Sequence, residues 1–428
     1  MRILVVSNAP LRKDNGLGNS LINIFGGIDD IEIASVYCRY GKTGTDLVKK
    51  SFQITEKSLL KNLKNKKSPS GKEVFSDETD LSYTEEPKSV EFVRKNRWTI
   101  LYWIRNVIWK IGRWKSDELL KFVDDFKPEI IFQPVFNAPH VNEIALFLKK
   151  HTGAPMVCYN VDDNYSLKQL SFSPFYWIDR LWKRKTVKKL IENCELLYTI
   201  SKVQKEECEE AFSKPCKILT KCADFSDDKK TEFKEPDNVL KMVYAGNVSK
   251  GRYEILAELA KTVEKLNTGS KKIELDIYTL SPLNEKQKAC LSTTAVHLYP
   301  PVSYNEIREI QKNSDILIHA EAFSLKERLL VHQSFSTKIV DYLETNRCIF
   351  AIGSDYCASI QYFLDNDCGL VATCKEEIEQ KLSQLIQNPD LMKEYADKAW
   401  ESGNKHNNAL VIRKNLEEDL KRIIKEDN

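Results

Sequence analysis

Residues 315–353 have the sequence DILIHAEAFSLKERLLVHQSFSTKIVDYLETNRCIFAIG, and this stretch decides the fold class. The apolar run ILIH predicts a short buried strand, and the apolar run CIFAIG predicts a second one. Between them, IVDYLET has helical spacing of its apolar residues. A strand, a helix and a second strand in this order form a βαβ unit with parallel strands, so the stretch predicts an α/β fold.

The start of the helix inside this stretch predicts an anion site. Ser334, Ser336 and Thr337 precede the helix, and their hydroxyl groups can cap its first turn. N–H groups left uncapped there would face an anion, and Lys338 adds a positive charge. The alternative is an ordinary βαβ unit in which the hydroxyls only cap the helix, and this turn considered alone favours that alternative.

Short β-rich runs alternate with helical patterns in two sets, which predicts two doubly wound α/β domains. The first set occupies residues 2–7, 31–37, 129–135, 156–161 and 196–201. The second set occupies residues 240–246, 272–279, 296–299, 315–319, 348–353 and 369–373.

Residues 227–238, DDKKTEFKEPDN, are charged and almost free of apolar side chains, so they predict a linker with a cleft beside it. The domains then cover residues 1–226 and 239–404, and residues 405–428 contain a last amphipathic helix. Residues 42–89 are rich in Lys, Ser, Glu and Asp and predict a long, partly disordered polar excursion with one short helix. This excursion is either a lid or acceptor-binding element, or a tolerated insertion.

Composition excludes several classes of protein. The chain has 428 residues, of which 42% are hydrophobic and 30% are charged, as in ordinary soluble enzymes. A net charge of +3 is too small to indicate nucleic-acid binding. The 11 cysteines form no CxxC pair and the first residues lack a leader-like apolar core, so we expect a reducing, cytoplasmic compartment. With no run of about 18 apolar residues, contact with a membrane would be peripheral.

The second domain opens with a strand followed by a basic turn, AGNVSKGRYEIL. Gly246 and Asn247 form the turn, and Lys250 and Arg252 follow it just before a helix. Arginine offers a fork that matches phosphate oxygens, whereas lysine acts as a compact charge. The two cations can therefore clamp a diphosphate, although a basic loop considered alone is usually only solvated.

Two loops of the first domain carry candidate site residues. Gly16 and Gly18 follow the first strand, but they lack the third glycine and the acidic residue of a dinucleotide fingerprint. Asp162 and Asp163 end another strand, at the sheet edge where open α/β folds place ligands. One of these carboxylates can face a ligand while the other caps a helix, and Asp-Asp-Asn is also a plain turn sequence.

Residues 95–115 and 172–189 combine basic and aromatic side chains. The first segment contains Trp98, Trp103, Trp109 and Trp114 and no acidic residue. Such segments occur as interfacial helices on anionic lipid, which would place the protein peripherally on the inner face of the cell membrane. The alternatives are a core helix with a basic rim, or stacking on nucleic acid, and no RNA-binding motif supports the latter.

The second half of the chain resembles the donor-binding region of GT-B glycosyltransferases, especially glycosyltransferase family four. In that family a glutamate, Gly-Phe-Gly and a second glutamate eight residues on precede a helix and a strand. Gln333, Ser334, Phe335 and Ser336 fall on the first part of this signature, and Asp341 falls on the second glutamate.

The resemblance implies a role for most of these residues. The backbone of Ser334 to Thr337 and Lys338 would hold the distal phosphate, Lys250 and Arg252 the diphosphate, and Asp341 the ribose. Gln333 departs from the family glutamate because an amide carries no charge, so Glu321 is the candidate for the missing carboxylate. The loop of Gly16 and Gly18 would approach the reaction centre. Asp162, where the family often has histidine, and its neighbour Asp163 are the remaining candidate catalytic residues.

The resemblance also implies two Rossmann-like domains facing a cleft, with the last helix crossing back onto the first domain. We therefore predict a retaining, metal-independent hexosyltransferase that uses a nucleotide-diphosphate sugar and needs no cofactor. Its acceptor would be a glycan or a lipid-linked molecule in the synthesis of bacterial capsule or lipopolysaccharide. The alternatives are a non-catalytic protein that binds sugar nucleotides, and a GT-B-like nucleotide-sugar epimerase. The sugar and the nucleotide are set by pocket shape, and no motif identifies them.

Overall fold

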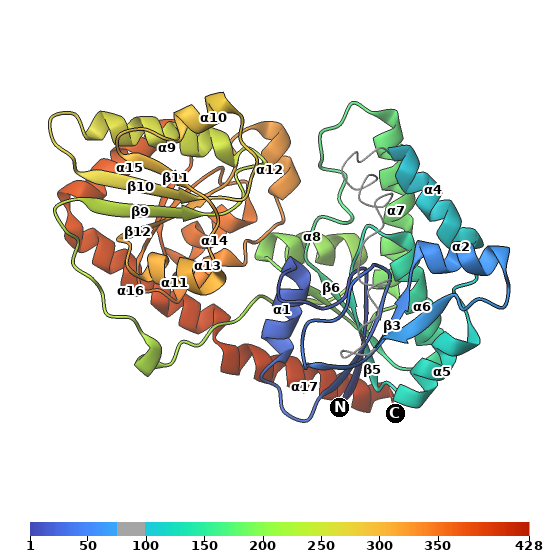
Figure 1. Ribbon diagram of the computed structural model, residues 1–428. Helices are drawn as coiled ribbons and strands as arrows, with labels where there is room; N and C mark the ends of the chain where they lie inside the picture. The colour runs from blue at the N-terminus through green and yellow to red at the C-terminus, as the bar shows by residue number, and fades with distance from the viewer. Residues whose placement is uncertain (75–98, 428) are drawn as a thin grey trace. The chain divides into compact units, whose positions relative to one another are not determined.

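The computed structural model describes residues 1–74 and 99–427. They form two compact units, each described here by itself. Unit 1 comprises Met1–Leu167, Ser171–Thr220 and Ile412–Asn428, and unit 2 comprises Lys168–Leu170 and Lys221–Val411. Figure 1 shows both units as mixtures of helices and strands, which confirms the predicted α/β class.

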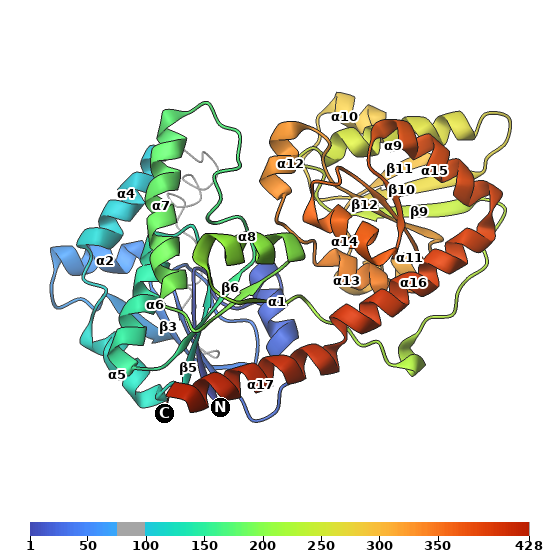
Figure 2. The ribbon, with the colours of Figure 1, turned by 180° about the vertical axis from the view of Figure 1, so that it is seen from behind.

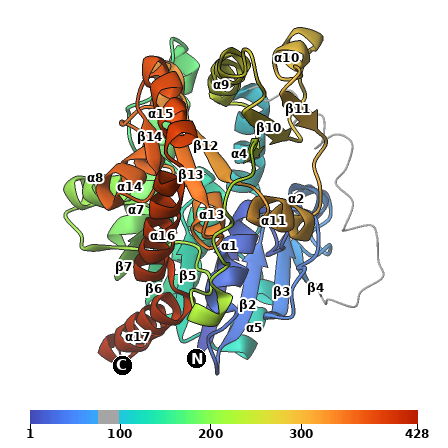
Figure 3. The same ribbon diagram turned by 90° about the vertical axis from the view of Figure 1, so that its left-hand side faces the viewer.

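Unit 1 contains an eight-stranded sheet with the order β4-β3-β2-β1-β5-β6-β7-β8. All neighbours pair in parallel except β3 and β4. Figure 3 shows the order across the sheet, from β7 through β6 and β5 to β2, β3 and β4. The strands are β1 (Arg2–Ser7), β2 (Glu32–Tyr37), β3 (Val48–Ile54), β4 (Gly71–Val74), β5 (Ile130–Pro134), β6 (Met156–Asn160), β7 (Leu196–Thr199) and β8 (Cys216–Ile218).

Helices cover both faces of this sheet, so its central strands are apolar on both sides. In β1, Leu4 and Val6 pack into the core on one face, and Ile3 and Val5 pack into the core on the other. The first face is covered by α4, α5, α6 and α7, and the second by α1 and the end of the chain in α17. The helices of this unit are α1 (Gly16–Phe25), α2 (Glu56–Lys64), α4 (Thr99–Ile111), α5 (Asp117–Phe126), α6 (Pro139–Thr152), α7 (Pro174–Glu192), α8 (Lys202–Phe212) and α17 (Ala409–Asp427).

Unit 2 contains a six-stranded, fully parallel sheet with the order β11-β10-β9-β12-β13-β14. Its strands are β9 (Leu240–Ala245), β10 (Ile273–Tyr278), β11 (Val296–Tyr299), β12 (Ile316–Ala320), β13 (Cys348–Ile352) and β14 (Leu370–Ala372). In Figures 1 and 2, α9 lies on one side of this sheet, and α11, α13 and α16 lie on the other. The helices are η2 (Asp227–Lys229), α9 (Arg252–Leu266), α10 (Glu285–Cys290), α11 (Tyr304–Lys312), α12 (Leu325–Val331), α13 (Lys338–Leu343), α14 (Ala358–Asn366), α15 (Lys375–Gln387) and α16 (Pro389–Asn407).

Every strand expected from the sequence is present within two residues of its expected bounds, but β3, β4 and β8 were not expected. The expectation of a polar excursion over residues 42–89 is wrong at β3 and β4, which lie within residues 48–74, whereas α2 is a short helix of the kind that the sequence predicted there. Polar side chains obscure these elements: β3 has the sequence VKKSFQI and lies near the sheet edge, where few apolar residues are needed. Residues 75–89 of the expected excursion lie outside the described residues.

The segment expected as a linker, 227–238, is bound to unit 2. Arg347 donates to the carbonyl of Glu232 at 2.8 Å, Asn346 donates to the carbonyl of Thr231 at 2.8 Å, and Phe233 packs against the core of the unit. The boundary between the two units falls earlier, between Thr220 and Lys221.

The last helix, α17, joins unit 1 from Ile412 onward. Leu416, Leu420 and Ile423 are buried in the same core as β1. The carboxylate of Asp419 accepts hydrogen bonds from the Tyr198 hydroxyl at 2.7 Å and the Lys217 ammonium at 2.5 Å. The end of the chain is therefore an integral part of unit 1.

Candidate functional site

The strand order of unit 2 reverses between β9 and β12, and open α/β sheets bind ligands beyond the carboxyl ends of the strands at such a point. Strand β9 ends at Ala245 and β12 ends at Ala320. The basic turn of residues 246–251 follows β9, and Glu321 follows β12. The candidate donor site of unit 2 is built around these two strand ends.

Arg252, the first residue of α9, is anchored to the end of β12. Its Nη2 donates to both carboxylate oxygens of Glu321 at 2.9 Å, and its Nε donates to the carbonyl of Ala320 at 3.0 Å. The Glu321 side chain is only 3% exposed, and its burial raises the pKa of the carboxyl, an effect that Arg252 opposes. Among the described residues no hydrogen bond occupies Nη1 of Arg252, so this nitrogen can serve another acceptor.

Lys338 reaches back from the start of α13 to the end of β9. Its ammonium donates to the carbonyl of Ala245 at 2.7 Å. A Cβ atom at Gly246 would lie 2.2 Å from this nitrogen, so the glycine leaves the room that the lysine occupies. Desolvation of the ammonium, together with the nearby charge of Arg252, lowers the pKa of Lys338 to about 8. Gly246 and Lys338, both expected at the donor site, are therefore neighbours at the end of β9.

His319, the fourth residue of β12, is a member of this site that the sequence pattern did not identify. Its Nε2 lies 3.7 Å from Oε1 of Glu321, and within the described part of the chain this nitrogen has no hydrogen-bond partner. Burial, followed by the charges of Arg252 and Lys338, lowers the pKa of the imidazole to about 3. The ring is therefore neutral. In the sequence, His319 ends an apolar run and is indistinguishable from a core residue.

The turn after β9 is held by its own side chains. Oδ1 of Asn247 accepts from the backbone N–H of Ser249 at 2.7 Å and from the Ser281 hydroxyl at 3.1 Å. Asn247 therefore shapes the turn. Lys250 is exposed, adopts a φ of 58°, and lies close enough for its charge to favour ionisation of Glu321. Asn247 is therefore used within the turn, whereas the exposed ammonium of Lys250 can bind a ligand.

The segment Ser334 to Thr337 differs from the expected helix cap. Helix α13 begins at Lys338, and Thr337 makes no side-chain capping hydrogen bond, so the prediction of a hydroxyl cap there is wrong. The backbone N–H of Ser336 instead donates to the Ser359 hydroxyl at 3.4 Å, and that hydroxyl donates to the carbonyl of Ser334 at 3.1 Å. The turn thus packs against α14 before α13 begins.

Phe335 and Gln333 are both buried. The ring of Phe335 packs edge-on against Tyr362 with centroids 5.1 Å apart, so it contributes to packing. Gln333 is 5% exposed, so the amide that replaces the family glutamate lies largely inside the fold.

Asp341 lies within α13 and is held by contacts that the sequence did not reveal. Its Oδ1 accepts from the Lys221 ammonium at 2.5 Å and from the Tyr304 hydroxyl at 3.1 Å. The guanidinium of Arg308 donates to the Asp341 carbonyl at 2.7 Å and to the Glu344 carboxylate at 2.7 Å. All hydrogen bonds to the Asp341 carboxylate within the described part of the chain go to Oδ1, which leaves Oδ2 for a further donor.

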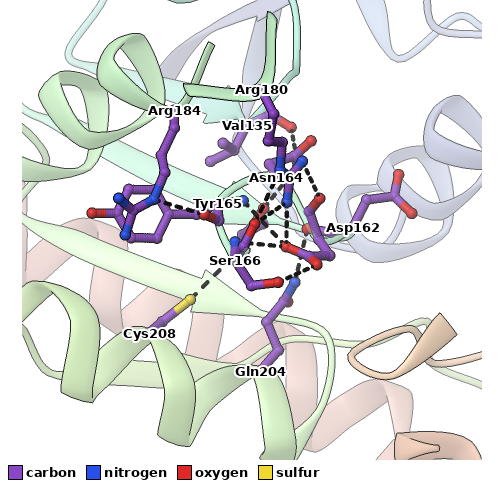
Figure 4. Close-up of polar contacts among 11 residues, drawn as sticks. Val135, Asp162, Asn164, Tyr165, Ser166, Arg180, Arg184, Gln204 and Cys208 are labelled. Atoms are coloured by element: carbon purple, nitrogen blue, oxygen red, sulfur yellow. Dashed lines mark hydrogen bonds and ion pairs between the residues drawn. The ribbon is translucent and has the colours of Figure 1, made fainter. Parts of the chain in front are cut away.

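In the first unit, the loop after β6 gives the two adjacent aspartates different environments. The carboxylate of Asp163 lies inside a network of polar contacts, and its partners Arg180, Ser166 and Tyr165 are labelled in Figure 4. It accepts from Nη2 of Arg180 at 2.8 Å, from the N–H of Ser166 at 2.8 Å and from the N–H of Tyr165 at 3.3 Å. The side chains of Asp163 and Arg180 are each 7% exposed. These contacts fasten the loop to α7, which is a structural use of the carboxylate.

Asp162 is exposed, and its side chain points away from the network in Figure 4. Its backbone is fixed, because its carbonyl accepts from the Gln204 amide at 3.0 Å. Nearby, the amide of Asn164 donates to the side chain of Asn160 and to the carbonyl of Val135, both at 3.0 Å. The loop is therefore rigidly attached while the Asp162 carboxylate faces outward.

The two glycines of the first loop have different surroundings. A Cβ atom at Gly18 would lie 2.5 Å from the Arg12 carbonyl oxygen, and the Gly18 N–H donates to the capping side chain of Asn15 at 2.6 Å. Gly18 is thus required by the packing of the loop onto α1. A Cβ atom at Gly16 would meet nothing within 4 Å.

The arrangement in unit 2 is suited to binding an anion. Lys250, Arg252 and Lys338 gather near the ends of β9 and β12, and Glu321 fixes the orientation of Arg252. Across the described residues, no group of three or more His, Cys, Asp or Glu side chains is arranged to hold a metal ion.

No protein-family model matches the sequence, and no curated protein matches it either. Solved structures do resemble it. The UDP complex of HepE (Alr3699) from Anabaena superposes with a TM-score of 0.63 at 12% identity, over 99% of this chain and 100% of HepE. OtsA without ligand gives 0.57 at 13% identity, over 98% of this chain and 99% of OtsA. WaaG, a glycosyltransferase involved in lipopolysaccharide biosynthesis, gives 0.53 at 12% identity, over 97% of this chain and 98% of WaaG.

At such low identities the likeness concerns the fold, and it extends over nearly the whole length of each chain. The two α/β units with their largely parallel sheets match the fold of these structures. The chain therefore has the GT-B fold of glycosyltransferases.

Proposed function

We propose that the protein is a glycosyltransferase that uses a nucleotide-diphosphate sugar as donor. The observation that carries this proposal is the convergence of Lys250, Arg252 and Lys338 near the ends of β9 and β12, where the strand order reverses. A diphosphate is the part of the donor that such a group of cations would recognise. HepE, which is similar in fold, is known in complexes with UDP and with UDP-glucose.

The cations would act on the leaving group. When the bond between sugar and diphosphate breaks, negative charge grows on the diphosphate, and prearranged positive groups stabilise that charge. Arg252 would use its Nη1, because Glu321 and Ala320 occupy its other donors. In this mechanism the cations supply the charge that a divalent metal ion supplies in other transferases.

Glu321 changes its role in this proposal. The sequence suggested it as the missing catalytic carboxylate, but its charge is already neutralised by Arg252. We therefore assign it as a positioning residue that aims the guanidinium at the diphosphate. Gln333 lies largely inside the fold and is assigned no contact with the sugar in this proposal.

Asp341 is proposed to bind the ribose through Oδ2. Lys221 and Tyr304 hold Oδ1 and so fix the orientation of the carboxylate. A carboxylate oxygen can accept from both ribose hydroxyl groups without moving the two existing partners.

On the acceptor side, Asp162 is the better candidate of the aspartate pair, because Asp162 is exposed whereas the Asp163 side chain is 7% exposed and is paired with Arg180. We propose that Asp162 orients or deprotonates the acceptor hydroxyl, and that Gly16 leaves space beside the reaction centre. Retention of anomeric configuration and a glycan or lipid-linked acceptor of bacterial surface polysaccharides complete the proposal.

A second candidate function is binding of a sugar nucleotide without turnover. It is favoured by the absence of the family glutamate at Gln333 together with the pairing of Glu321 to Arg252. Neither residue then offers a free carboxylate to the sugar, whereas the diphosphate clamp is complete. Donor binding without hydrolysis or transfer would support this alternative.

The test is nucleotide affinity in Arg252→Ala and Lys338→Ala, measured by calorimetry with a panel of nucleoside diphosphates. Each change removes a charged hydrogen bond, typically about 1.5–3 kcal/mol, which corresponds to roughly 10–100-fold weaker binding. Lys272→Ala is the control, because Lys272 is an exposed cation just before β10. It lies at the amino-terminal end of that strand, whereas the candidate site lies at the carboxyl ends of the strands. Unchanged affinity in both site variants would rule out the clamp.

A further inference from the structure

Unit 1 exposes an apolar face on two helices, α4 and α7. On α4, Ile104, Val107 and Ile111 are each more than half exposed, at 53%, 55% and 57%. Their spacing of three and four residues places them in one stripe along the helix. Single exposed apolar residues are ordinary, but a stripe of them is not.

Helix α7 has a second stripe with the same spacing. Phe175, Ile178 and Trp182 are 60%, 57% and 40% exposed, and Phe172, just before the helix, is 94% exposed. We call these four residues, together with Ile104, Val107 and Ile111, the α4/α7 face. The two helices lie side by side in Figures 1 and 2, and the rings of Trp103 and Phe175 are in contact with centroids 6.1 Å apart.

The composition of this face differs from what the sequence indicated. Trp109 and Trp114, expected at a membrane interface, are buried at 2% and 6% exposure. Trp109 stacks on His140 at 4.2 Å and donates to Glu56 at 2.9 Å, and Trp114 packs edge-on against Phe147. These tryptophans therefore anchor α4 to unit 1 and turn its aliphatic stripe outward. Trp98 lies outside the described residues.

Positive charges border the face. Lys110, Arg113 and Lys115 are exposed on and just after α4, and residues 99–115 contain no Asp or Glu. On α7, Lys185 and Lys189 are exposed, and its first acidic residue, Asp179, is neutralised by Lys183 at 2.5 Å. Glu143 on α6 lies near this border. Burial raises the pKa of its carboxyl, and the nearby charges of Lys115, Lys189 and Lys110 oppose this effect, so the border carries an excess of cations rather than cations alone. Bulky apolar side chains beside an excess of cations are the two features that hold a helix at the surface of an anionic bilayer.

We infer that the α4/α7 face binds the surface of a membrane that contains anionic lipid. Charge decides between this occupant and a second copy of the chain. In a twofold dimer through this face, the same basic border would meet itself and repel. An anionic lipid surface instead complements the border and takes up the apolar side chains. No helix within residues 1–74 and 99–427 is long and apolar enough to span a membrane, so the contact would be superficial.

The inference deepens the proposed function. It rests on that proposal only where it explains why the protein would bind a membrane: unit 1, which carries the proposed acceptor residue Asp162, would meet an acceptor held in the membrane. Several buried apolar side chains and several nearby cations contribute together to binding at an anionic surface. Loss of several apolar side chains should therefore abolish measurable binding.

The experiment is flotation with phosphatidylcholine vesicles and with vesicles that also contain phosphatidylglycerol. We expect the full chain to float with the anionic vesicles only, and less at high salt. Phe172→Ser combined with Phe175→Ser and Ile178→Ser should reduce the floating fraction at least tenfold, as should Lys110→Glu combined with Arg113→Glu. The control is Leu280→Ser combined with Leu410→Ser, because both leucines are about as exposed, at 82% and 79%, but lie in unit 2.

Each outcome has a defined meaning. Flotation of the triple serine variant at the level of the unchanged protein would overturn the inference, and so would equal binding to both kinds of vesicle. A concentration-dependent dimer that the serine changes dissociate, with no flotation, would assign the face to a second copy and also overturn it. Nucleotide affinity is measured in the same samples: lost flotation with intact nucleotide binding concerns the face alone, and lost nucleotide binding with intact flotation contradicts only the proposed donor site.

Discussion

Both units place charged residues beyond the ends of parallel strands but use them in different ways. In unit 2 these residues lie at the ends of β9 and β12, between which the strand order reverses, whereas in unit 1 they follow β6, away from the reversal between β1 and β5. In unit 1 the charges of Asp163 and Arg180 satisfy each other and hold a loop. In unit 2 the cations outnumber the nearby carboxylates, because Lys250, Arg252 and Lys338 lie near Glu321. The Asp341 carboxylate is also close to Lys338, but it is already paired with Lys221. Excess charge of one sign, rather than charge itself, distinguishes a site for a ligand from a structural network.

The largest expected effect is a loss of stability when the Asp163 network of unit 1 is broken. Asp163→Ala leaves the buried Arg180 guanidinium without its carboxylate, and breaking a buried pair in this way costs about 3–5 kcal/mol. The melting temperature should fall by on the order of 10 °C. Calorimetry measures it, and Asp14→Ala is the control, because Asp14 pairs with Arg12 at the surface of the same unit. Equal stability of the two variants would mean that the Asp163 network is not structural.

Glu321→Gln tests the corresponding carboxylate in unit 2. A positioning role predicts roughly 10–100-fold weaker nucleotide binding, because the Arg252 fork loses its charged anchor. The turnover of bound donor should then change little. A catalytic carboxylate would instead lose turnover with little change in nucleotide affinity. Calorimetry and a donor-hydrolysis assay on the same preparation separate the two, and Glu401→Gln, at an exposed position of α16, is the control.

A smaller effect is expected from pH. The pKa of Lys338 is lowered to about 8, so its charge is present below this pH and is lost as the pH rises through it. An anionic nucleotide prefers the charged form, and its affinity should therefore fall about tenfold between pH 7 and pH 9. Lys338→Arg keeps the charge in this range, and its affinity should stay level. A parallel fall in both proteins, measured by calorimetry, would place the titrating group elsewhere.

The sequence predicted most of the fold because the central strands are buried on both faces and form continuous apolar runs, as in β1 and β13. It did not predict β3, β4 and β8, which lie at or next to the edges of the sheet and carry lysines. The expected excursion at residues 48–74 failed for this reason.

For the candidate site, the sequence indicated Lys250, Arg252 and Lys338, because each stands in a recognisable turn before a helix. The sequence could not indicate which charged side chains form ion pairs with each other. The Arg252–Glu321 pair spans 69 residues and the Lys221–Asp341 pair spans 120, and no local pattern encodes such distances. The same is true of Asp162 and Asp163, whose different roles depend on Arg180 in the following helix.

The path of the chain has a consequence for how the protein is made. The chain leaves unit 1 at Thr220 and returns at Ile412, so unit 2 is an insertion within unit 1. Leu416, Leu420 and Ile423 close a core that begins with Ile3 and Val5. During synthesis, the part of this sheet face that α17 covers therefore stays exposed until the second unit has emerged from the ribosome. The part of the protein that is made first is the part that finishes folding last.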